Sequence, residues 1–148
     1  MTLWDNPEEW QKLQEGTTCP ICLQGKPKDI LVELPNTWIT AGVEAPLPGY
    51  VCIVSKTHVA EPFELPQAGQ AAFWQESMKV AKAISNLLQP IKVNYEIHGN
   101  TIPHLHLHFF PRMKGDPYVG GPIDSHKASF TRTPEDLERI KSAIQKLV

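Results

Sequence analysis

The sequence predicts an α+β fold built around an antiparallel sheet. Segments with strand character outnumber those with helical periodicity, and the helical segments do not alternate one for one with the strands. A doubly wound parallel sheet would require that alternation, so its absence favours antiparallel pairing. A chain of 148 residues also has the size of one compact domain, and we expect a single domain over residues 1–148.

Three segments have the periodicity and end signals of helices. The strongest runs from Gln67 to Gln89, where apolar residues recur at three- and four-residue spacing between two prolines. Near the N-terminus, residues 6–9 (Asn-Pro-Glu-Glu) provide a cap, a proline at the first helical position and an acidic first turn, and Gly16 provides a stop. Residues 133–136 (Thr-Pro-Glu-Asp) repeat this start signal before a second amphipathic stripe. We therefore expect one long helix and a shorter helix near each end of the chain.

Five stretches rich in β-branched and aromatic residues are predicted strands. A Pro-Asn turn signal at residues 35–36 separates the first two, and residues 98–101 separate the last two, so each pair should form an antiparallel hairpin. Residues 113–129, with three glycines and two prolines, are predicted to form a long loop. The predicted strands are Ile30–Leu34, Thr37–Ile39, Gly49–Ser55, Lys92–Ile97 and His104–Phe110.

Composition argues against several classes of protein. With 14 Lys+Arg against 16 Asp+Glu, the formal charge is −2, which does not suit a nucleic-acid binder because phosphates require a basic surface. No run of about 18 apolar residues is present, so we expect no membrane span. The acidic N-terminus does not resemble a signal peptide, and three cysteines are an odd number for a disulfide scaffold. These features predict a cytoplasmic protein with reduced thiols.

Three histidines alternate with apolar residues in the last predicted strand. Because strand side chains alternate between faces, His104, His106 and His108 are expected on one face, with neighbours about 7 Å apart. The apolar residues between them should pack under the long helix. A row of imidazoles can bind a transition metal, hold an anion when protonated, or provide a nucleophile with proton-transfer partners. The residues alone leave a metal site and phosphate chemistry equally open.

The histidine strand and its flanks resemble the histidine triad family of nucleotide hydrolases and transferases. Residues 104–110 match every position of the family pattern His-φ-His-φ-His-φ-φ, where φ is apolar. Residues 99–103 (Gly-Asn-Thr-Ile-Pro) and 111–112 (Pro-Arg) are similar to the flanks of small bacterial members of the diadenosine polyphosphate hydrolase type. Residues 48–59 are similar to the other characteristic strand of the family, which ends in Lys-x-His. The resemblance covers a core of about residues 19–112 and leaves 113–148 as a C-terminal loop and helix.

This resemblance implies a fold and an activity. The fold is a five-stranded antiparallel sheet with a long central helix across it and additional N- and C-terminal helices, assembled as a homodimer. The activity is hydrolysis of a purine nucleotide substrate bound with its α-phosphate over the triad. His106, the middle histidine, attacks phosphorus and forms a nucleotidyl–histidine that water hydrolyses to a nucleoside monophosphate. The resemblance makes dinucleoside polyphosphates and nucleoside phosphoramidates the expected substrates.

The resemblance also assigns roles to other residues. His104 and His108 are expected to orient His106, hydrogen-bond phosphate oxygens and assist proton transfer to the leaving group. Asn100 stands where many relatives have glutamine, and its amide is assigned to a phosphoryl oxygen. Asn94 is a second amide candidate for nucleotide binding, although an ordinary role on the polar face of the sheet is equally open.

Some positions depart from the family pattern. Many relatives have histidine after Pro-Gly, where this chain has Tyr50. Residues 40–43 lack the acidic or amide side chain that often contacts the ribose in relatives. The loop at 113–129 is longer than in compact relatives, and we expect His126 within it to be solvated.

The pair Cys19 and Cys22 permits two interpretations. A redox pair would be expected at a helix start in a βαβ context, which is missing. Half of a zinc site would require two further nitrogen or sulfur ligands. In some histidine triad proteins such a pair binds structural zinc with the histidine of Lys-x-His and the first triad histidine. The resemblance therefore implies a structural zinc held by Cys19, Cys22, His58 and His104, whereas Cys52 is expected to be a buried apolar residue.

Two other functions stay open at this point. A non-catalytic nucleotide- or zinc-binding regulatory protein could use the same pocket, and it would bind nucleotide without releasing a monophosphate. A metalloenzyme with zinc held by the triad itself would lose its activity on chelation.

Overall fold

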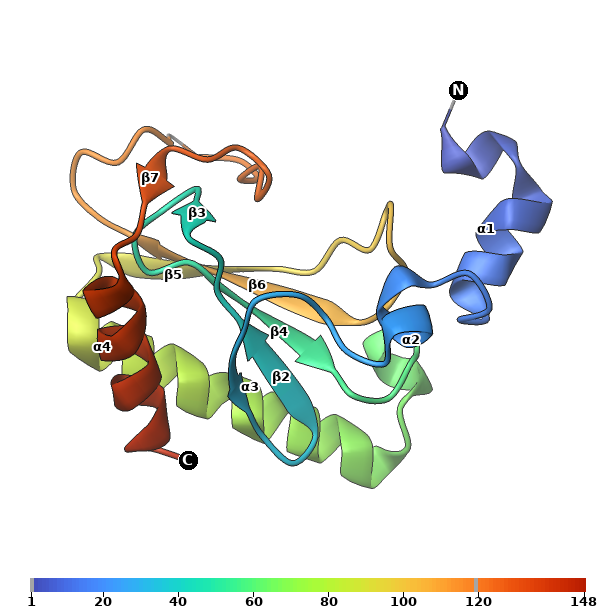
Figure 1. The fold of residues 1–148 in the computed structure, drawn as a ribbon, viewed down its shortest axis with the longest axis horizontal. Coiled ribbons are helices and arrows are strands. Elements are labelled where there is room, and N and C mark those ends of the chain that lie inside the picture. The colour runs from blue at the N-terminus through green and yellow to red at the C-terminus, as the bar shows by residue number, and fades with distance from the viewer. Residues whose placement is uncertain (1, 119) are drawn as a thin grey trace.

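The computed structural model describes residues 2–118 and 120–148, and it has the predicted α+β fold. A long helix, α3, lies across one face of a five-stranded antiparallel sheet, and α4 packs beside α3 (Figure 1). The strand order is β1-β2-β4-β6-β5, so β6 is second from the β5 edge. The strands of this sheet are β1 (Ile30–Glu33), β2 (Thr37–Thr40), β4 (Val51–Ser55), β5 (Lys92–Glu96) and β6 (His106–Arg112).

The three predicted helices form where their end signals lie. α1 (Pro7–Gln14) begins after Asn6, whose side chain accepts a hydrogen bond from the Glu9 N–H. α4 (Pro134–Gln145) begins after Thr133, which exchanges hydrogen bonds with Asp136 as a capping box. α3 (Gln67–Leu88) ends one residue before the predicted position, because Gln89 adopts a left-handed conformation with φ of 50°.

Several short elements lack a local signal in the sequence. α2 (Pro20–Gln24) is too short to show helical periodicity. β3 (Glu44–Ala45) pairs with β7 (Phe130–Thr131), and a contact between segments so far apart in sequence leaves no local pattern. Two 3-10 turns, Leu3–Asp5 and Pro62–Glu64, complete the described secondary structure.

The start of the histidine strand differs from the prediction. β6 begins at His106 and not at His104. The N–H of His104 donates to the carbonyl of Ile102 in a tight turn, and Leu105 exchanges backbone hydrogen bonds with Val59 and Ser55. The two residues before β6 are thus held by the segment after β4, which sets a different direction for the His104 side chain.

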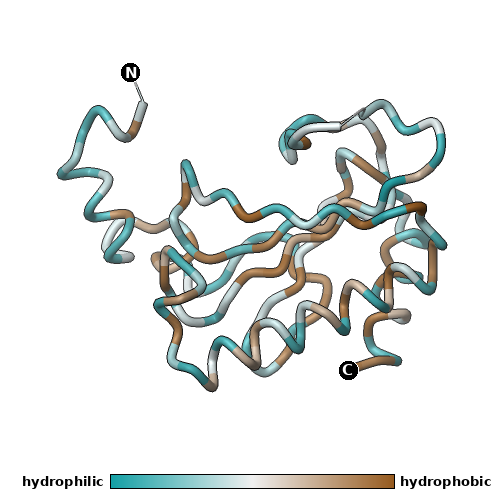
Figure 2. The backbone as a smooth tube through the Cα atoms, turned by 180° about the vertical axis from the view of Figure 1, so that it is seen from behind, coloured by the Kyte–Doolittle hydropathy of each residue, from teal (hydrophilic) through white to brown (hydrophobic). Residues whose placement is uncertain are grey.

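The hydrophobic core lies between the sheet and the two helices α3 and α4. In Figure 2 the hydrophobic segments follow the inner strands, while α3 alternates between hydrophobic and hydrophilic residues as a helix with one buried face should. Burying one large apolar side chain contributes about 1.5–3 kcal/mol, so this layer supplies most of the stabilisation. Its buried members include Phe73, Val80, Ile84, Leu105, Leu107, Phe109, Ile140 and Ile144.

Gly49 allows the chain to enter β4 close to the end of α3. A Cβ atom at this position would lie 2.2 Å from Cδ1 of Leu88 and 3.0 Å from Cγ of Pro111. The Pro-Gly step in the sequence is therefore a packing requirement at this helix-sheet contact.

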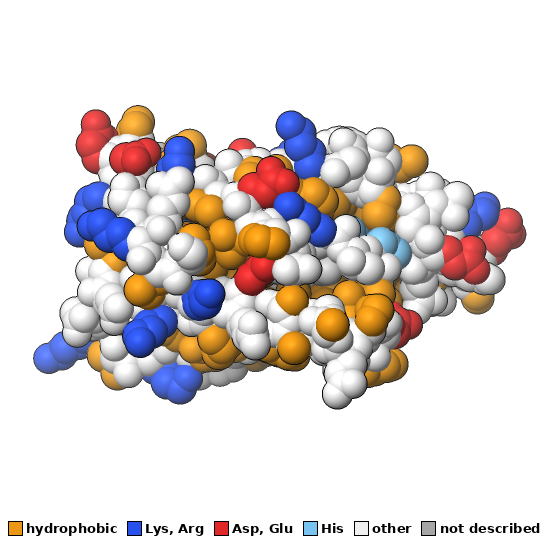
Figure 3. Space-filling view, turned by 90° about the horizontal axis from the view of Figure 1, so that it is seen from below, with side chains coloured by type: hydrophobic (Ala, Val, Ile, Leu, Met, Phe, Trp, Pro, Cys, Tyr) orange, Lys and Arg blue, Asp and Glu red, His pale blue; other side chains and the backbone are white. Residues whose placement is uncertain are grey.

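The outer surface of α3 carries apolar side chains as well as charged ones. Trp74 and Met78 are 41% and 45% exposed. Viewed from below the fold of Figure 1, the molecule shows apolar side chains lying between lysines and acidic residues (Figure 3). Within the described residues, no helix combines the length and apolar character needed to cross a membrane.

The turn between β1 and β2 is tied to α3 by one carboxylate. Glu76 accepts hydrogen bonds from the backbone N–H of Asn36 at 3.0 Å, from its side-chain amide at 2.9 Å and from the Thr37 hydroxyl at 2.6 Å. Thr37 is fully buried, so its hydroxyl depends on this acceptor.

We expect Glu76→Ala to lower the free energy of unfolding by about 1–3 kcal/mol, because it leaves a buried hydroxyl without an acceptor. Glu76→Gln should lower it less, since an amide oxygen still accepts. Urea unfolding followed by circular dichroism measures both changes. Lys79→Ala, at an exposed position of the same helix, is the control and should stay within about 0.5 kcal/mol. A Glu76→Ala value equal to that of the control would contradict the proposed tether.

Candidate functional site

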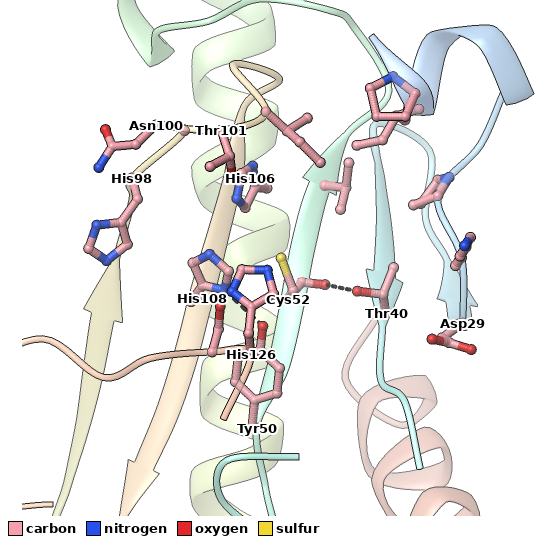
Figure 4. Close-up of a pocket in the computed structure, with 18 of the residues that line it drawn as sticks. Asp29, Thr40, Tyr50, Cys52, His98, Asn100, Thr101, His106, His108 and His126 are labelled. Atoms are coloured by element: carbon pink, nitrogen blue, oxygen red, sulfur yellow. Dashed lines mark hydrogen bonds between the residues drawn. The ribbon is translucent and has the colours of Figure 1, made fainter. Parts of the chain in front are cut away.

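A cavity of about 750 Å³ lies over the face of the sheet opposite α3 and extends across several strands (Figure 4). The strand register places Thr40, Cys52 and His108 side by side on β2, β4 and β6, and all three line the cavity. Residues of α2 form one wall, and residues 123–126, after β6, line the cavity from another side. This volume lies in the range of small-molecule and nucleotide sites.

His106 is held in a defined tautomer at the start of β6. Its Nδ1 lies 2.6 Å from the carbonyl oxygen of His104. A carbonyl oxygen can only accept, so Nδ1 carries the proton and Nε2 keeps its lone pair. Burial lowers the pKa of His106, which keeps the ring neutral near pH 7. The arrangement provides a neutral imidazole whose Nε2 can act as a nucleophile.

His108 is held by Tyr50, the residue at the position where many relatives have histidine. The Tyr50 hydroxyl lies 2.8 Å from Nδ1 of His108, and Tyr50 stacks on Phe110 at 5.1 Å between ring centroids. Burial is the main cause that lowers the pKa of His108 to about 3, and burial also raises the pKa of Tyr50. The phenol therefore keeps its proton and can donate it to Nδ1, which leaves Nε2–H of a neutral His108 as a hydrogen-bond donor.

The predicted row of three imidazoles is wrong for His104. The rings of His106 and His108 lie edge to face with centroids 4.9 Å apart. The His104 side chain points instead toward the two cysteines, with Nδ1 3.5 Å from Sγ of Cys19 and 3.6 Å from Sγ of Cys22. The reason is the later start of β6, which leaves His104 outside the alternation of the strand. His104 contacts His106 through its backbone carbonyl.

The structure brings together the four predicted metal ligands. One ligand atom from each of them lies within 4.8 Å of the others. Nδ1 of His58 lies 3.2 Å from Sγ of Cys22 and 3.1 Å from Nδ1 of His104. In a tetrahedral Cys₂His₂ zinc site, ligand atoms lie about 3.3–3.8 Å apart. The four residues, Cys19, Cys22, His58 and His104, therefore form a candidate metal site.

The hydrogen bonds of the two histidines test whether a cation fits this cluster. Nε2 of His58 lies 2.8 Å from the carbonyl oxygen of Gln14, and Nε2 of His104 lies 2.7 Å from that of Ser55. Both Nε2 atoms must donate, so both Nδ1 atoms face each other with lone pairs. Two lone pairs at 3.1 Å repel unless a positive charge lies between them. Backbone carbonyls that fix the ring tautomer in this way are typical of metal-binding histidines.

The two predicted amides lie in different places. Asn100 lines the cavity, in the connection between β5 and β6. Asn94 is not among the residues that line it; its side-chain oxygen accepts a hydrogen bond from Arg112 at 2.9 Å. Arg112 also donates two hydrogen bonds to Asp116, so Asn94 contributes to ordering the segment after β6.

Several residues that line the cavity had no assigned role in the sequence analysis. Asp29 lies just before β1, and Pro20 and Ile21 lie between the two cysteines of the candidate metal site. His98 lies in what sequence patterns mark only as a turn, and His126 lines the cavity although its side chain is 88% exposed, as expected for a solvated residue. The sequence signal that could have identified His98 is its position two residues after Glu96, at the end of a predicted strand.

The chain matches a known domain family and one of its curated members. Residues 24–115 match the HIT domain family. The chain is 31% identical over 104 residues to "Protein hit" of Bacillus subtilis (strain 168), which covers 66% of this chain and 70% of that protein.

Solved structures share the fold. A histidine triad protein from Bradyrhizobium japonicum superimposes with a TM-score of 0.71 and 22% identity, covering 80% of this chain and 89% of that chain. A Zn-bound histidine triad family protein from Mycobacterium smegmatis gives a TM-score of 0.63 and 23% identity, covering 88% and 96%. With a family match over most of its length and this fold, the chain belongs to the histidine triad, or HIT, domain family of nucleotide hydrolases and transferases.

Proposed function

We propose that the protein hydrolyses nucleoside phosphate derivatives at the α-phosphorus, through a nucleotidyl–histidine intermediate on His106. The product is a nucleoside monophosphate, and the substrates are dinucleoside polyphosphates or nucleoside phosphoramidates. The observation that carries the proposal is the tautomer of His106, whose Nδ1–H donates to the His104 carbonyl and whose Nε2 is free to attack. Membership of the HIT domain family supports the same chemistry.

Two bond changes make up the proposed reaction. In the first step, Nε2 of His106 bonds to phosphorus and the bond to the leaving group breaks. The imidazole then carries positive charge, which the His104 carbonyl stabilises through the 2.6 Å hydrogen bond. In the second step, water attacks phosphorus, the phosphorus–nitrogen bond breaks and His106 is restored.

The neighbours of His106 supply uncharged donors for the phosphoryl oxygens. Nε2–H of His108 and the amide of Asn100 both belong to residues that line the cavity, and each can donate without adding charge. Cys52 lies on the adjacent strand opposite His108, but burial raises the pKa of its thiol to about 12. A protonated thiol is a poor nucleophile, so Cys52 does not compete with His106.

The apolar part of the cavity suits a purine base. Apolar side chains line the side of the cavity away from β5. They belong to Pro20 and Ile21 of α2, Pro27 before β1, and Val54 of β4. A flat purine ring would bury apolar area against them, while Asp29 offers an acceptor for hydroxyl groups of the ribose.

His106→Ala should lower turnover by at least about 1,000-fold, because the covalent intermediate forms on Nε2 of this residue. Binding of a nucleoside monophosphate should stay within about tenfold, since the site loses one neutral ring. Monophosphate release measured by chromatography and affinity measured by calorimetry test both statements on adenosine and guanosine substrates. A variant that retains more than a few per cent of wild-type activity would exclude His106 as the nucleophile. A wild-type protein that binds nucleotide but releases no monophosphate would instead favour a regulatory binding protein.

We further propose that Cys19, Cys22, His58 and His104 hold one structural zinc ion. The separations of the ligand atoms and the tautomers of both histidines support this assignment. When bound, the metal would join α2, the segment after β4 and the residues before β6. Four protein ligands leave no open coordination position for water, so the residues fit a structural site better than a catalytic one.

Metal analysis of protein purified without chelators should give about one zinc per chain. Cys22→Ser should lower zinc content and melting temperature together, while activity of the folded fraction falls less than in His106→Ala. Cys52→Ala, which changes the cysteine outside the cluster, is the matched control and should keep its zinc. Zinc content near zero in the wild-type protein would refute the assignment.

We also propose that two copies of the chain associate through the β5 edge. Among the described strands, β5 pairs only with β6, so its outer edge has free backbone groups. Tyr95 in β5 is 45% exposed, and Ile91 and Ile97, which flank the strand, are 74% and 37% exposed. An unpaired edge strand with exposed apolar side chains in and beside it is a template for pairing with another strand.

Light scattering should give twice the chain mass of 16.6 kDa for the wild-type protein. Ile97→Asp should shift it toward the monomer, because the change places a charge beside the pairing edge. Phe63→Asp, a 75% exposed position outside β5, serves as the control and should leave the mass unchanged. The interface would be contradicted if the wild-type protein had the mass of a monomer. It would also be contradicted if Phe63→Asp lowered the mass and Ile97→Asp did not.

A further inference from the structure

A carboxylate–imidazole pair lies beside the triad and has no role in the mechanism so far. Nε2 of His98 lies 2.8 Å from a carboxylate oxygen of Glu96, whose side chain is 13% exposed. The other oxygen of Glu96 accepts a hydrogen bond from the N–H of Ile123 at 3.0 Å. Glu96 is paired with His108 in the strand ladder, so its side chain lies on the cavity face of the sheet. The pair is thus fixed from two directions.

The hydrogen bond to Glu96 determines which nitrogen of His98 can exchange a proton. A carboxylate oxygen accepts, so Nε2 of His98 donates its hydrogen to Glu96 and Nδ1 is the ring nitrogen that faces other partners. Glu96 also provides the opposite charge for an imidazolium. His98 is therefore a candidate acid–base group that lines the cavity, and Glu96 is the partner that orients its ring.

The position of His98 places it on the leaving-group side. β6 is second from the β5 edge, so most of the cavity extends from His106 toward β4, β2 and β1. Figure 4 shows Asp29 and Thr40 on one side of His106, with His98 and Asn100 on the other. If the nucleoside occupies the larger, apolar side, the leaving group lies toward β5, where the His98 ring is 6.1 Å from that of His108.

The other histidines of the cavity and of the metal cluster have other partners or roles, or lie in solvent. Both ring nitrogens of His104 are engaged, by the cysteine cluster and by the Ser55 carbonyl. His106 is the nucleophile, and burial keeps His108 neutral. His126 is 88% exposed, and its nearest carboxylate, on Asp124, is 3.6 Å away and 66% exposed. Of these rings, His98 is the one held by a largely buried carboxylate.

We propose that His98, positioned by Glu96, is the general acid that protonates the leaving group and the general base that activates water. This inference rests on the proposed function. In the first step, Nε2 of His106 bonds to phosphorus, the leaving atom takes the electron pair of the broken bond, and it receives the proton of His98 Nδ1. In the second step, water bonds to phosphorus, its proton goes to His98 Nδ1, and Nε2 of His106 leaves with its electron pair. The sum is substrate plus water giving monophosphate plus protonated leaving group.

Leaving-group basicity tests this role. The substrates are the p-nitrophenyl and phenyl esters of adenosine 5′-monophosphate, which differ little in size. The p-nitrophenolate ion is weakly basic and departs without a proton, whereas phenolate benefits from protonation. For His98→Ala, kcat/KM on the phenyl ester should fall about 100-fold or more, and on the p-nitrophenyl ester by less than about tenfold. Because the second step still lacks its base, the p-nitrophenyl ester should also give a burst of p-nitrophenol followed by slow turnover.

Companion variants separate this role from structural effects. Glu96→Gln should show the same preference for the p-nitrophenyl ester with a smaller loss, since it removes the charge that holds His98. His126→Ala is the matched control, and any loss should be equal for the two esters. His98→Asn replaces His98→Ala if circular dichroism shows the alanine variant to be unfolded.

The outcomes divide clearly. Equal losses on both esters in His98→Ala, or no loss on either, overturn the assignment of His98 while leaving the proposed function intact. Failure of the wild-type protein to release monophosphate from either ester overturns the proposed function and this inference with it.

Discussion

The position of residue 104 is the constraint on which the candidate site depends. Its carbonyl oxygen accepts the Nδ1–H of His106, which frees the opposite nitrogen of that ring. Its own Nε2 donates to Ser55 at the end of β4, and its Nδ1 completes the cysteine cluster beside α2. One residue thus links the cavity, the central sheet and the candidate metal site, and its carbonyl fixes the tautomer of His106.

Local sequence signals predicted most of the fold because the interactions that they describe are local. The cap at Asn6, the capping box at Thr133 and the apolar spacing of α3 all involve residues within a few positions of each other. The pairing of β3 with β7 and the start of β6 depend on contacts with distant segments, which leave no periodic pattern. The alternation of histidines was visible in sequence, but the residue at which the strand begins was not.

The candidate site divides in the same way. The cysteines and histidines of the metal cluster were recognisable from a family resemblance, and the structure brings them together. The sequence left two roles open for Asn94, and only the structure shows that Arg112 engages its side chain. His98 was hidden in a predicted turn, since its significance depends on Glu96 and on the return of residues 123–126 to the cavity.

The residues after the triad help to hold the site. Ile123 is buried against Leu47 and Phe110, in a second apolar cluster that includes Tyr50. Arg132, after β7, is buried and donates to the backbone carbonyls of Gly42, Pro48 and Tyr50. Tyr50 in turn contacts His108 through its hydroxyl. The C-terminal part of the chain therefore helps to position a triad residue, because Arg132 binds the backbone of Tyr50 and Tyr50 binds His108.

Burial has opposite effects on the acids and bases of the cavity, and together these effects produce a neutral site. It lowers the pKa of His106 and of His108, whereas it raises the pKa of Cys52 and of Tyr50. All four side chains are therefore uncharged near pH 7. Under the proposed function, a substrate phosphate beside these side chains is stabilised by oriented N–H donors, and the charge that develops on the leaving group requires a separate proton source. Glu96 and His98, with side chains 13% and 41% exposed, lie beside these neutral groups and form the proton source that we propose.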